Sequence, residues 1–247
     1  MLPFFTHDHS ALQTQVRLWV ENKLFAGHDG EGDIDRRARS LVHELGAAGF
    51  LKYTVPRQFG GVREQVEARD LCILREELAR GDALADTMFA LQALGSFPIT
   101  LAGSTAQKQN YLPRVANGAA IAAFAITEPE AGSDVASLQT TAVRQREQFA
   151  LNGTKRFISN AGIADFYVVF ASTTPEKKAK GVSAFIVDAT TPGLAVTKEL
   201  LVREADMDLV QALELEASEQ ARLMQAPDFK EGYRAFIEKR PAKFNQS

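Results

Sequence analysis

The spacing of apolar residues changes once along this chain, near Ala120, and that change limits the folds open to it. Up to about residue 117, apolar residues recur at the three-to-four residue spacing of amphipathic helices. The stripes are Val16, Trp19, Val20 and Leu24, then Ala38, Leu41, Val42 and Leu45, then Leu71, Leu74 and Leu78, then Leu84, Met88, Leu91 and Leu94, and finally Tyr111, Leu112 and Val115. Packing of such stripes against one another stabilises helices more than intrinsic propensity does. The first part of the chain is therefore predicted to be a helical bundle.

Two capping boxes predict where helices of this bundle begin. Ser10 is followed three residues later by Gln13, and Ser104 is followed in the same way by Gln107. In such a pair, each side chain accepts a hydrogen bond from the backbone N–H of the other residue. A cap contributes about 1 kcal/mol, so these boxes mark helix starts rather than hold the bundle together.

After Ala120 the pattern becomes that of strands separated by turns. A compact apolar run covers residues 121–127, and strands are predicted at residues 139–142, 148–151, 166–172 and 182–187. The dipeptide Asn152-Gly153 is typical of a tight hairpin turn, here predicted within residues 149–155. The fold class is therefore α+β: an N-terminal helical bundle, an incomplete β-barrel or sandwich domain, and a short helical tail.

The tail is predicted because the helical period returns beyond Leu200. Residues 207–224 alternate glutamate with apolar residues, and a short helix is expected from Asp228, ending before Pro241. The expected division of the chain is thus a helical domain at residues 1–119, a β domain at 120–200 and a helical tail at 201–247.

Composition excludes several classes of protein. The chain has 247 residues, 45% of them hydrophobic, and a net charge of −3, which favours neither nucleic acid nor an anionic membrane as partner. No stretch approaches the ~18 apolar residues of a membrane span, and the N-terminus does not resemble a signal peptide, so we expect a cytoplasmic protein. The single cysteine, Cys72, excludes an intramolecular disulfide, and its apolar neighbours predict that it is buried.

The stretch 124–134, F-A-I-T-E-P-E-A-G-S-D, carries the chemistry. It reads as a strand that runs into a loop containing Thr127, Gly132 and Ser133. Such a loop exposes backbone N–H groups and hydroxyls, which suit a phosphate or a flat polar heterocycle. On spacing alone, an ordinary surface turn is the favoured explanation of these residues.

The identity of the residues resembles the acyl-CoA dehydrogenase family. Residues 127–134 resemble its T-E-P-x-A-G-S-D signature, and residues 152–161, N-G-T-K-R-F-I-S-N-A, resemble N-G-x-K-x-[WF]-I-[ST]-N-[GA]. Upstream, residues 56–61 resemble P-x-x-x-G-G, and residues 107–113 resemble Q-K-x-x-Y-L-P. The four motifs occur in the family's order, and the resemblance covers residues 1 to about 198.

The resemblance implies a bound FAD and an acyl-CoA thioester substrate. Phe124, Ile126 and Thr127 would line the isoalloxazine, with Thr127 on its polar edge. Gly132 and Ser133 would approach the pyrophosphate, and Ser133 would also contact the thioester arm of the substrate. The implied flavin contacts in the second motif are Phe157, Ile158 and Ser159. Phe157, where many relatives have Trp, would cover one flavin face without an indole donor, and Ser159 would reach flavin N5.

Four other polar residues are interpreted without a catalytic or metal-binding role. Glu128 lies between Thr127 and Pro129 and is interpreted as a structural carboxylate rather than a catalytic base. Lys155 is interpreted as a solvated turn residue. His7 and His9 form a pair near the N-terminus, which is a weak basis for a metal site.

In the resembled family, a glutamate of a C-terminal four-helix domain removes the substrate proton, and no segment of this sequence resembles that domain. Residues 216–241 instead resemble the C-terminal end of the enoyl-CoA hydratase (crotonase) family, without its catalytic segments. We therefore expect a truncated and fused flavoprotein with weak or no turnover. If active, it would pass electrons to an electron-transferring flavoprotein, and a homo-oligomer is a further expectation. The alternatives are a non-catalytic FAD- or CoA-binding or subunit-interaction fragment, and a product of gene rearrangement.

Overall fold

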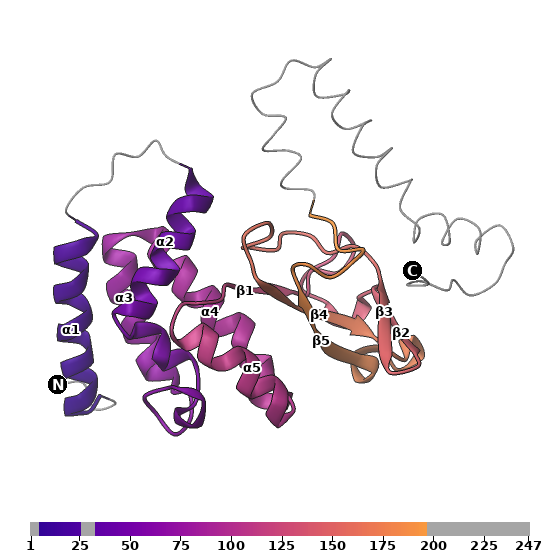
Figure 1. Ribbon diagram of the computed structural model, residues 1–247, viewed down its shortest axis with the longest axis horizontal. Coiled ribbons are helices and arrows are strands. Elements are labelled where there is room, and N and C mark those ends of the chain that lie inside the picture. The colour runs from indigo at the N-terminus through magenta and orange to yellow at the C-terminus, as the bar shows by residue number, and fades with distance from the viewer. Residues whose placement is uncertain (1–4, 26–32, 197–247) are drawn as a thin grey trace, which may run out of the picture. The chain divides into compact units, whose positions relative to one another are not determined.

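The computed structural model describes residues 5–25 and 33–196, in which helices precede strands as the sequence predicts (Figure 1). The α-helices of this part are α1 (His7–Lys23), α2 (Ile34–Ala47), α3 (Ala68–Gly81), α4 (Ala83–Ala102) and α5 (Thr105–Ala116). The strands are β1 (Ala122–Ala125), β2 (Thr141–Gln145), β3 (Gln148–Asn152), β4 (Phe166–Ser172) and β5 (Val182–Asp188). Short 3-10 helices are η1 (Phe50–Thr54), η2 (Arg57–Phe59), η3 (Val135–Ser137) and η4 (Pro175–Gly181). The predicted helical tail lies outside the described residues.

The helices pack through the apolar stripes found in the sequence. α1 contacts α3, α3 contacts α4, and α2 and α5 both contact α4. The stripe of α4 was wrong in part, because Leu94 is 47% exposed while Gln92, Gly95 and Ser96 are buried. α4 is apolar around most of its circumference, so apolar spacing alone does not identify its buried face.

The two predicted capping boxes have different outcomes. The box at Ser104 is confirmed, because the Gln107 N–H donates to Ser104 Oγ and the Ser104 N–H donates to Gln107 Oε1. The box at Ser10 is wrong, because α1 already begins at His7. Thr6 is the residue before that helix, and its N–H donates to His9 Nδ1 at 3.0 Å. The first turn is therefore completed before Ser10 is reached.

Cys72 is exposed, so the prediction that it is buried was wrong. Its helix, α3, buries Ile73, Leu74 and Leu78. Successive helical residues are turned by about 100°, so an apolar neighbour along the chain does not share the same face. Cys72 lies on the solvent-facing side of α3.

The strands form one mixed five-stranded sheet with β4 at its centre. β1 pairs parallel with β4, from Ala122 opposite Phe166 to Ala125 opposite Val169. β5 pairs antiparallel with β4 over its full length, while β2 meets β4 at one end and carries β3 as an antiparallel partner. Within the described residues the sheet is open, so it is a partial sandwich layer and not a closed barrel. β4 is covered by pairing on both edges, which agrees with its nearly continuous apolar sequence.

The hairpin of β2 and β3 differs from the prediction at its turn. Gln145 pairs with Gln148, so the turn is Arg146-Glu147, and Arg146 has a positive φ of 55°. Asn152 is instead the last residue of β3. A Cβ on Gly153 would lie 2.7 Å from Thr140 Cα, so this glycine is needed for close approach of two segments and not for a turn.

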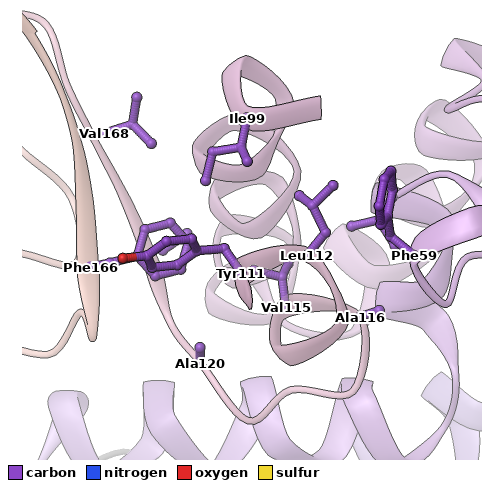
Figure 2. Close-up of a cluster of buried hydrophobic side chains, with 11 residues drawn as sticks. Phe59, Ile99, Tyr111, Leu112, Val115, Ala116, Ala120, Phe166 and Val168 are labelled. Atoms are coloured by element: carbon purple, nitrogen blue, oxygen red, sulfur yellow. The ribbon is translucent and has the colours of Figure 1, made fainter. Parts of the chain in front are cut away.

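A cluster of buried side chains joins α4 and α5 to β1 and β4 (Figure 2). Leu112, Val115 and Ile99 contribute from the helices, and Phe166 and Val168 contribute from β4. The rings of Tyr111 and Phe166 lie 4.9 Å apart between centroids. Burial of these side chains, each contributing about 1.5–3 kcal/mol, fixes the sheet against the bundle and so places the loops that follow β1.

Among the described residues, no helix combines the length and the hydropathy that a membrane-spanning segment needs.

Candidate functional site

The first strand of the site, β1, is fixed at its start by buried polar contacts. Gln92 of α4 is fully buried, and its Nε2 donates to Ala120 O while its Oε1 accepts from the Ala122 N–H, both at 2.7 Å. A Cβ on Gly95 would lie 2.6 Å from Ala122 Cβ, so this glycine allows the helix and strand to touch. These contacts set where β1 ends and where the next loop begins.

The loop after β1 closes on itself at Glu128. The Glu128 N–H donates to Ala131 O at 3.0 Å, and the Ala131 N–H donates to Glu128 O at 3.3 Å. Asp134 then caps η3 by accepting from the Ala136 N–H at 3.2 Å. Gly132 lies between these two fixed points, and the position of a Cβ on it would have no atom within 4 Å. The backbone at Gly132 therefore faces open space.

The second motif lies beside the first and is hydrogen-bonded to it. The Arg156 N–H donates to Thr127 O at 2.9 Å. Lys155 Nζ donates to Ile126 O at 3.0 Å and to Glu128 Oε1 at 2.7 Å. Two stretches that are 29 residues apart at Ile126 and Lys155 are thus joined at three points.

Glu128 is a buried carboxylate with three donors. It is 5% exposed and accepts from the N–H groups of Gln139 and Thr140 as well as from Lys155. Burial alone would raise the pKa of Glu128, but hydrogen bonds from Lys155 and the two amides outweigh it and hold the pKa at about 2. The interpretation of Glu128 as a structural carboxylate is confirmed, since an anion with these partners is a poor proton acceptor.

Lys155 is the partner of Glu128 in a buried ion pair, so its interpretation as a solvated turn residue was wrong. Its side chain is 11% exposed. Burial lowers the pKa of Lys155, and the hydrogen bond and charge of Glu128 offset only part of that effect. The short Nζ–Oε1 distance indicates an ion pair at neutral pH.

Sequence reasoning missed Lys155 because its partner lies 27 residues away. A signal was present: Glu128 follows a buried apolar run, and a buried carboxylate needs a positively charged or N–H partner. Asn160 was missed for the same reason. It is buried, has a positive φ of 65°, and its Nδ2 donates to Ala122 O at 3.0 Å.

Phe157 lies between these two anchored residues and points outward. It is 79% exposed and has a positive φ of 56°, which is rare for an aromatic residue and costs of the order of 1–3 kcal/mol. The guanidinium carbon of Arg156 lies 4.4 Å from the centre of its ring. Because strained backbone occurs mainly where it serves a function, Phe157 is a candidate contact for a ligand.

The other predicted site residues lie on the same two stretches. Phe124 is half-buried in β1, with its ring 4.9 Å from that of Phe170, and Ile126 and Thr127 are half-buried just after β1. Gly132, Ser133 and Ser159 are exposed, and Ile158 is half-buried. Contacts join the 126–128 and 155–156 segments, but within the described residues no hydrogen bond joins Gly132 or Ser133 to residues 157–159.

His9 has a structural position in the first turn of α1. It is 3% exposed, and its Nε2 lies 3.5 Å from Asp70 Oδ1. No group of three or more His, Cys, Asp or Glu side chains in the described part of the chain is arranged to hold a metal ion.

The fold and the paired loops can be compared with known proteins. Residues 6–119 match the family description "Acyl-CoA dehydrogenase, N-terminal domain", and residues 123–211 match "Acyl-CoA dehydrogenase, middle domain". An acyl-CoA dehydrogenase of Bacillus subtilis is 35% identical over 195 residues, covering 78% of this chain and 51% of that protein. Cyclohexane-1-carbonyl-CoA dehydrogenase of Geobacter metallireducens is 40% identical over 173 residues, covering 70% of this chain and 44% of that protein.

A solved structure shows the same architecture. Glutaryl-CoA dehydrogenase of Mycobacterium smegmatis, in complex with FADH2, superposes with a TM-score of 0.67 and 31% identity, covering 77% of this chain and 48% of that one. The chain therefore belongs to the acyl-CoA dehydrogenase family through its N-terminal and middle domains. It spans about half the length of the curated relatives it matches.

Proposed function

We propose that this chain is an acyl-CoA dehydrogenase-type flavoprotein whose β domain binds FAD through the loop 126–133 and the segment 155–159. The proposal rests on the hydrogen bonds between these two stretches. Lys155 donates to Ile126 O and to Glu128, and the Arg156 N–H donates to Thr127 O. This last hydrogen bond pairs the half-buried Thr127 with Arg156, the residue before the strained and exposed Phe157. When bound, FAD supplies an acceptor for the hydride lost in α,β-dehydrogenation of an acyl thioester.

The residues present fit this cofactor. Thr127 and Ser159 offer hydroxyls for the polar edge of the flavin, and Phe124, Ile126, Phe157 and Ile158 offer apolar surface for its rings. The open space at Gly132 and the exposure of Ser133 leave backbone N–H groups free to approach a pyrophosphate. The FADH2 complex of the related glutaryl-CoA dehydrogenase supports the same assignment.

We propose an acyl-CoA thioester as the second ligand, with Ser133 on its thioester arm. Family membership and relatives named as acyl-CoA and cyclohexane-1-carbonyl-CoA dehydrogenases support this class of substrate. An electron-transferring flavoprotein would be the electron acceptor of an active form, and self-association remains part of the proposal. The cytoplasmic location and the division at residues 1–119, 120–200 and 201–247 stay predictions of the sequence, as does the crotonase-like identity of the tail.

The chain is proposed to bind these ligands with little or no turnover of its own. Glu128 is the carboxylate nearest Thr127 in sequence, and its pKa of about 2 and three donors make it unsuited to removing a substrate proton. We therefore propose a binding-competent chain with little or no turnover, and a product of gene rearrangement stays the alternative that the sequence predicts.

The visible spectrum of the purified chain tests the proposal. We expect FAD to give a yellow complex that stays oxidised when a panel of acyl-CoAs is added without oxygen. Bleaching by any acyl-CoA would contradict the low-turnover part of the proposal. A protein that is folded by circular dichroism yet stays colourless with excess FAD would contradict the flavin site itself.

A further inference from the structure

The ion pair of Glu128 and Lys155 connects three segments of the β domain. Glu128 follows β1, Lys155 follows β3, and the Gln139 and Thr140 amides that donate to Glu128 precede β2. The pair is therefore placed where the entry to one strand and the exits of two others meet. Its removal would take one shared contact from all three segments.

Lys155 binds a backbone carbonyl in addition to the Glu128 carboxylate. Its Nζ donates to Ile126 O, one residue before Thr127, whose own carbonyl accepts from the Arg156 N–H. The Lys155 side chain therefore holds the residue before Thr127, and the Arg156–Thr127 backbone hydrogen bond joins the same two segments. On the other side of Phe157, Asn160 is held to Ala122 O. Phe157 therefore lies between two hydrogen-bonded residues, Arg156 and Asn160.

A buried ion pair is weak evidence for stability in itself, because an apolar pair of similar volume often stabilises as much. Such a pair is better suited to holding a defined geometry than to adding stability. The pair is also directional: the carboxylate faces two N–H donors, and the ammonium group faces a carbonyl. If the two charges were exchanged, the carboxylate would face a carbonyl and the ammonium group would face two N–H donors.

We propose that Glu128 and Lys155 are positioning residues of the flavin site: they hold Thr127 and Phe157 at the spacing that the isoalloxazine requires, without contacting the cofactor. The inference rests on the proposed FAD site and adds to it the residues that determine its geometry. Supporting residues of this kind tune affinity through the groups that they hold in place.

The test compares K155M with K155R, and with K177M as matched control. Lys177 is an exposed lysine of η4, and it has no place in the site. We expect K155M to weaken FAD binding by about tenfold or more, the loss typical of a supporting contact. K155R, which can still donate to both acceptors, should recover most of the affinity, and K177M should match the unaltered chain.

Two readouts separate positioning from a general loss of structure. The visible band of bound FAD should change shape in K155M, whereas a residue that only aids folding would reduce the amount of bound flavin and leave its spectrum unchanged. Hydrogen exchange without FAD should show faster exchange of the Arg156, Gln139 and Thr140 amides in K155M, with helix α5 still protected. If K155M keeps those amides protected, or binds FAD like K177M, the inference is wrong.

The two proposals fail in different ways. A chain that does not bind FAD in its unaltered form contradicts the proposed function, and the exchange of the three amides still decides whether Lys155 holds the loops. A chain that binds FAD equally well with and without the Lys155 ammonium group contradicts the positioning role alone. If K155M fails to fold, the same measurements of FAD affinity and amide exchange are made on E128Q, which removes the other charge of the pair.

Discussion

At the scale of single residues, the site depends on groups whose partners are distant in sequence. Glu128 remains ionised because two amides and one ammonium group surround it, although burial alone would favour the neutral acid. Phe157 shows the converse, a large apolar side chain left in solvent on a strained backbone. Both departures from ordinary residue behaviour occur on the same pair of stretches, as expected for a functional site.

The first prediction concerns pH. The pKa of Glu128 is about 2 in the folded chain, below its ordinary value of 4.5, so its contribution to stability is present above about pH 4.5 and is lost as the pH falls toward 2. That contribution is on the order of 3 kcal/mol. Urea unfolding of the unaltered chain should show this loss between pH 4.5 and 2, and E128Q should lack that component. An identical pH profile for both proteins would show that the carboxylate is not held as described.

The second prediction compares two glycines. Gly153→Ala should lower the free energy of unfolding by about 1–3 kcal/mol, because its Cβ would overlap Thr140. Gly132→Ala should leave stability almost unchanged, since its Cβ would enter open space. Thermal unfolding of the two variants provides the comparison. Equal destabilisation would contradict the close approach at Gly153.

At the scale of elements, the sequence predicts what local signals determine. The Ser104 cap and the stripe of Leu41, Val42 and Leu45 depend on residues within one or two turns, and the structure confirms them. The predicted turn of the β2–β3 hairpin was wrong, because Asn152-Gly153 has the sequence of a hairpin turn but lies at the end of β3. The glycine is needed there for its close approach to Thr140, a tertiary contact that the local sequence does not reveal. Lys155 was misinterpreted since only the folded sheet brings it to Glu128.

The third prediction tests the packing of β4 on the helices. Phe166→Ala should lower the free energy of unfolding by about 3–5 kcal/mol, because Phe166 is fully buried against Tyr111. Leu101→Ala on α4 is the control, since Leu101 is 67% exposed and its loss should change stability by at most about 0.5 kcal/mol. Urea unfolding distinguishes the two. Similar losses in both variants would place the core elsewhere.

At the scale of the whole molecule, fold class and family follow from the order of the motifs, and the detailed geometry of the site does not. The helical-to-strand change near Ala120 predicted an α+β fold, and the structure and comparisons confirm it. The sheet is open within the described residues, and the chain spans about half the length of its curated relatives. Roles that depend on residues outside the two matched domains therefore remain proposals.

The central claim is that the two joined stretches form an FAD site, and a titration of FAD against Phe157→Ala tests it most directly. Phe149→Ala is the matched control, because Phe149 is also an exposed aromatic of the β domain, 44% exposed on β3. Flavin fluorescence should show tight binding by the unaltered chain and by Phe149→Ala. Phe157→Ala should bind about tenfold or more weakly, as expected for loss of an aromatic contact of about 1.5 kcal/mol or more. Equal affinity of all three proteins would contradict the placement of the flavin against Phe157.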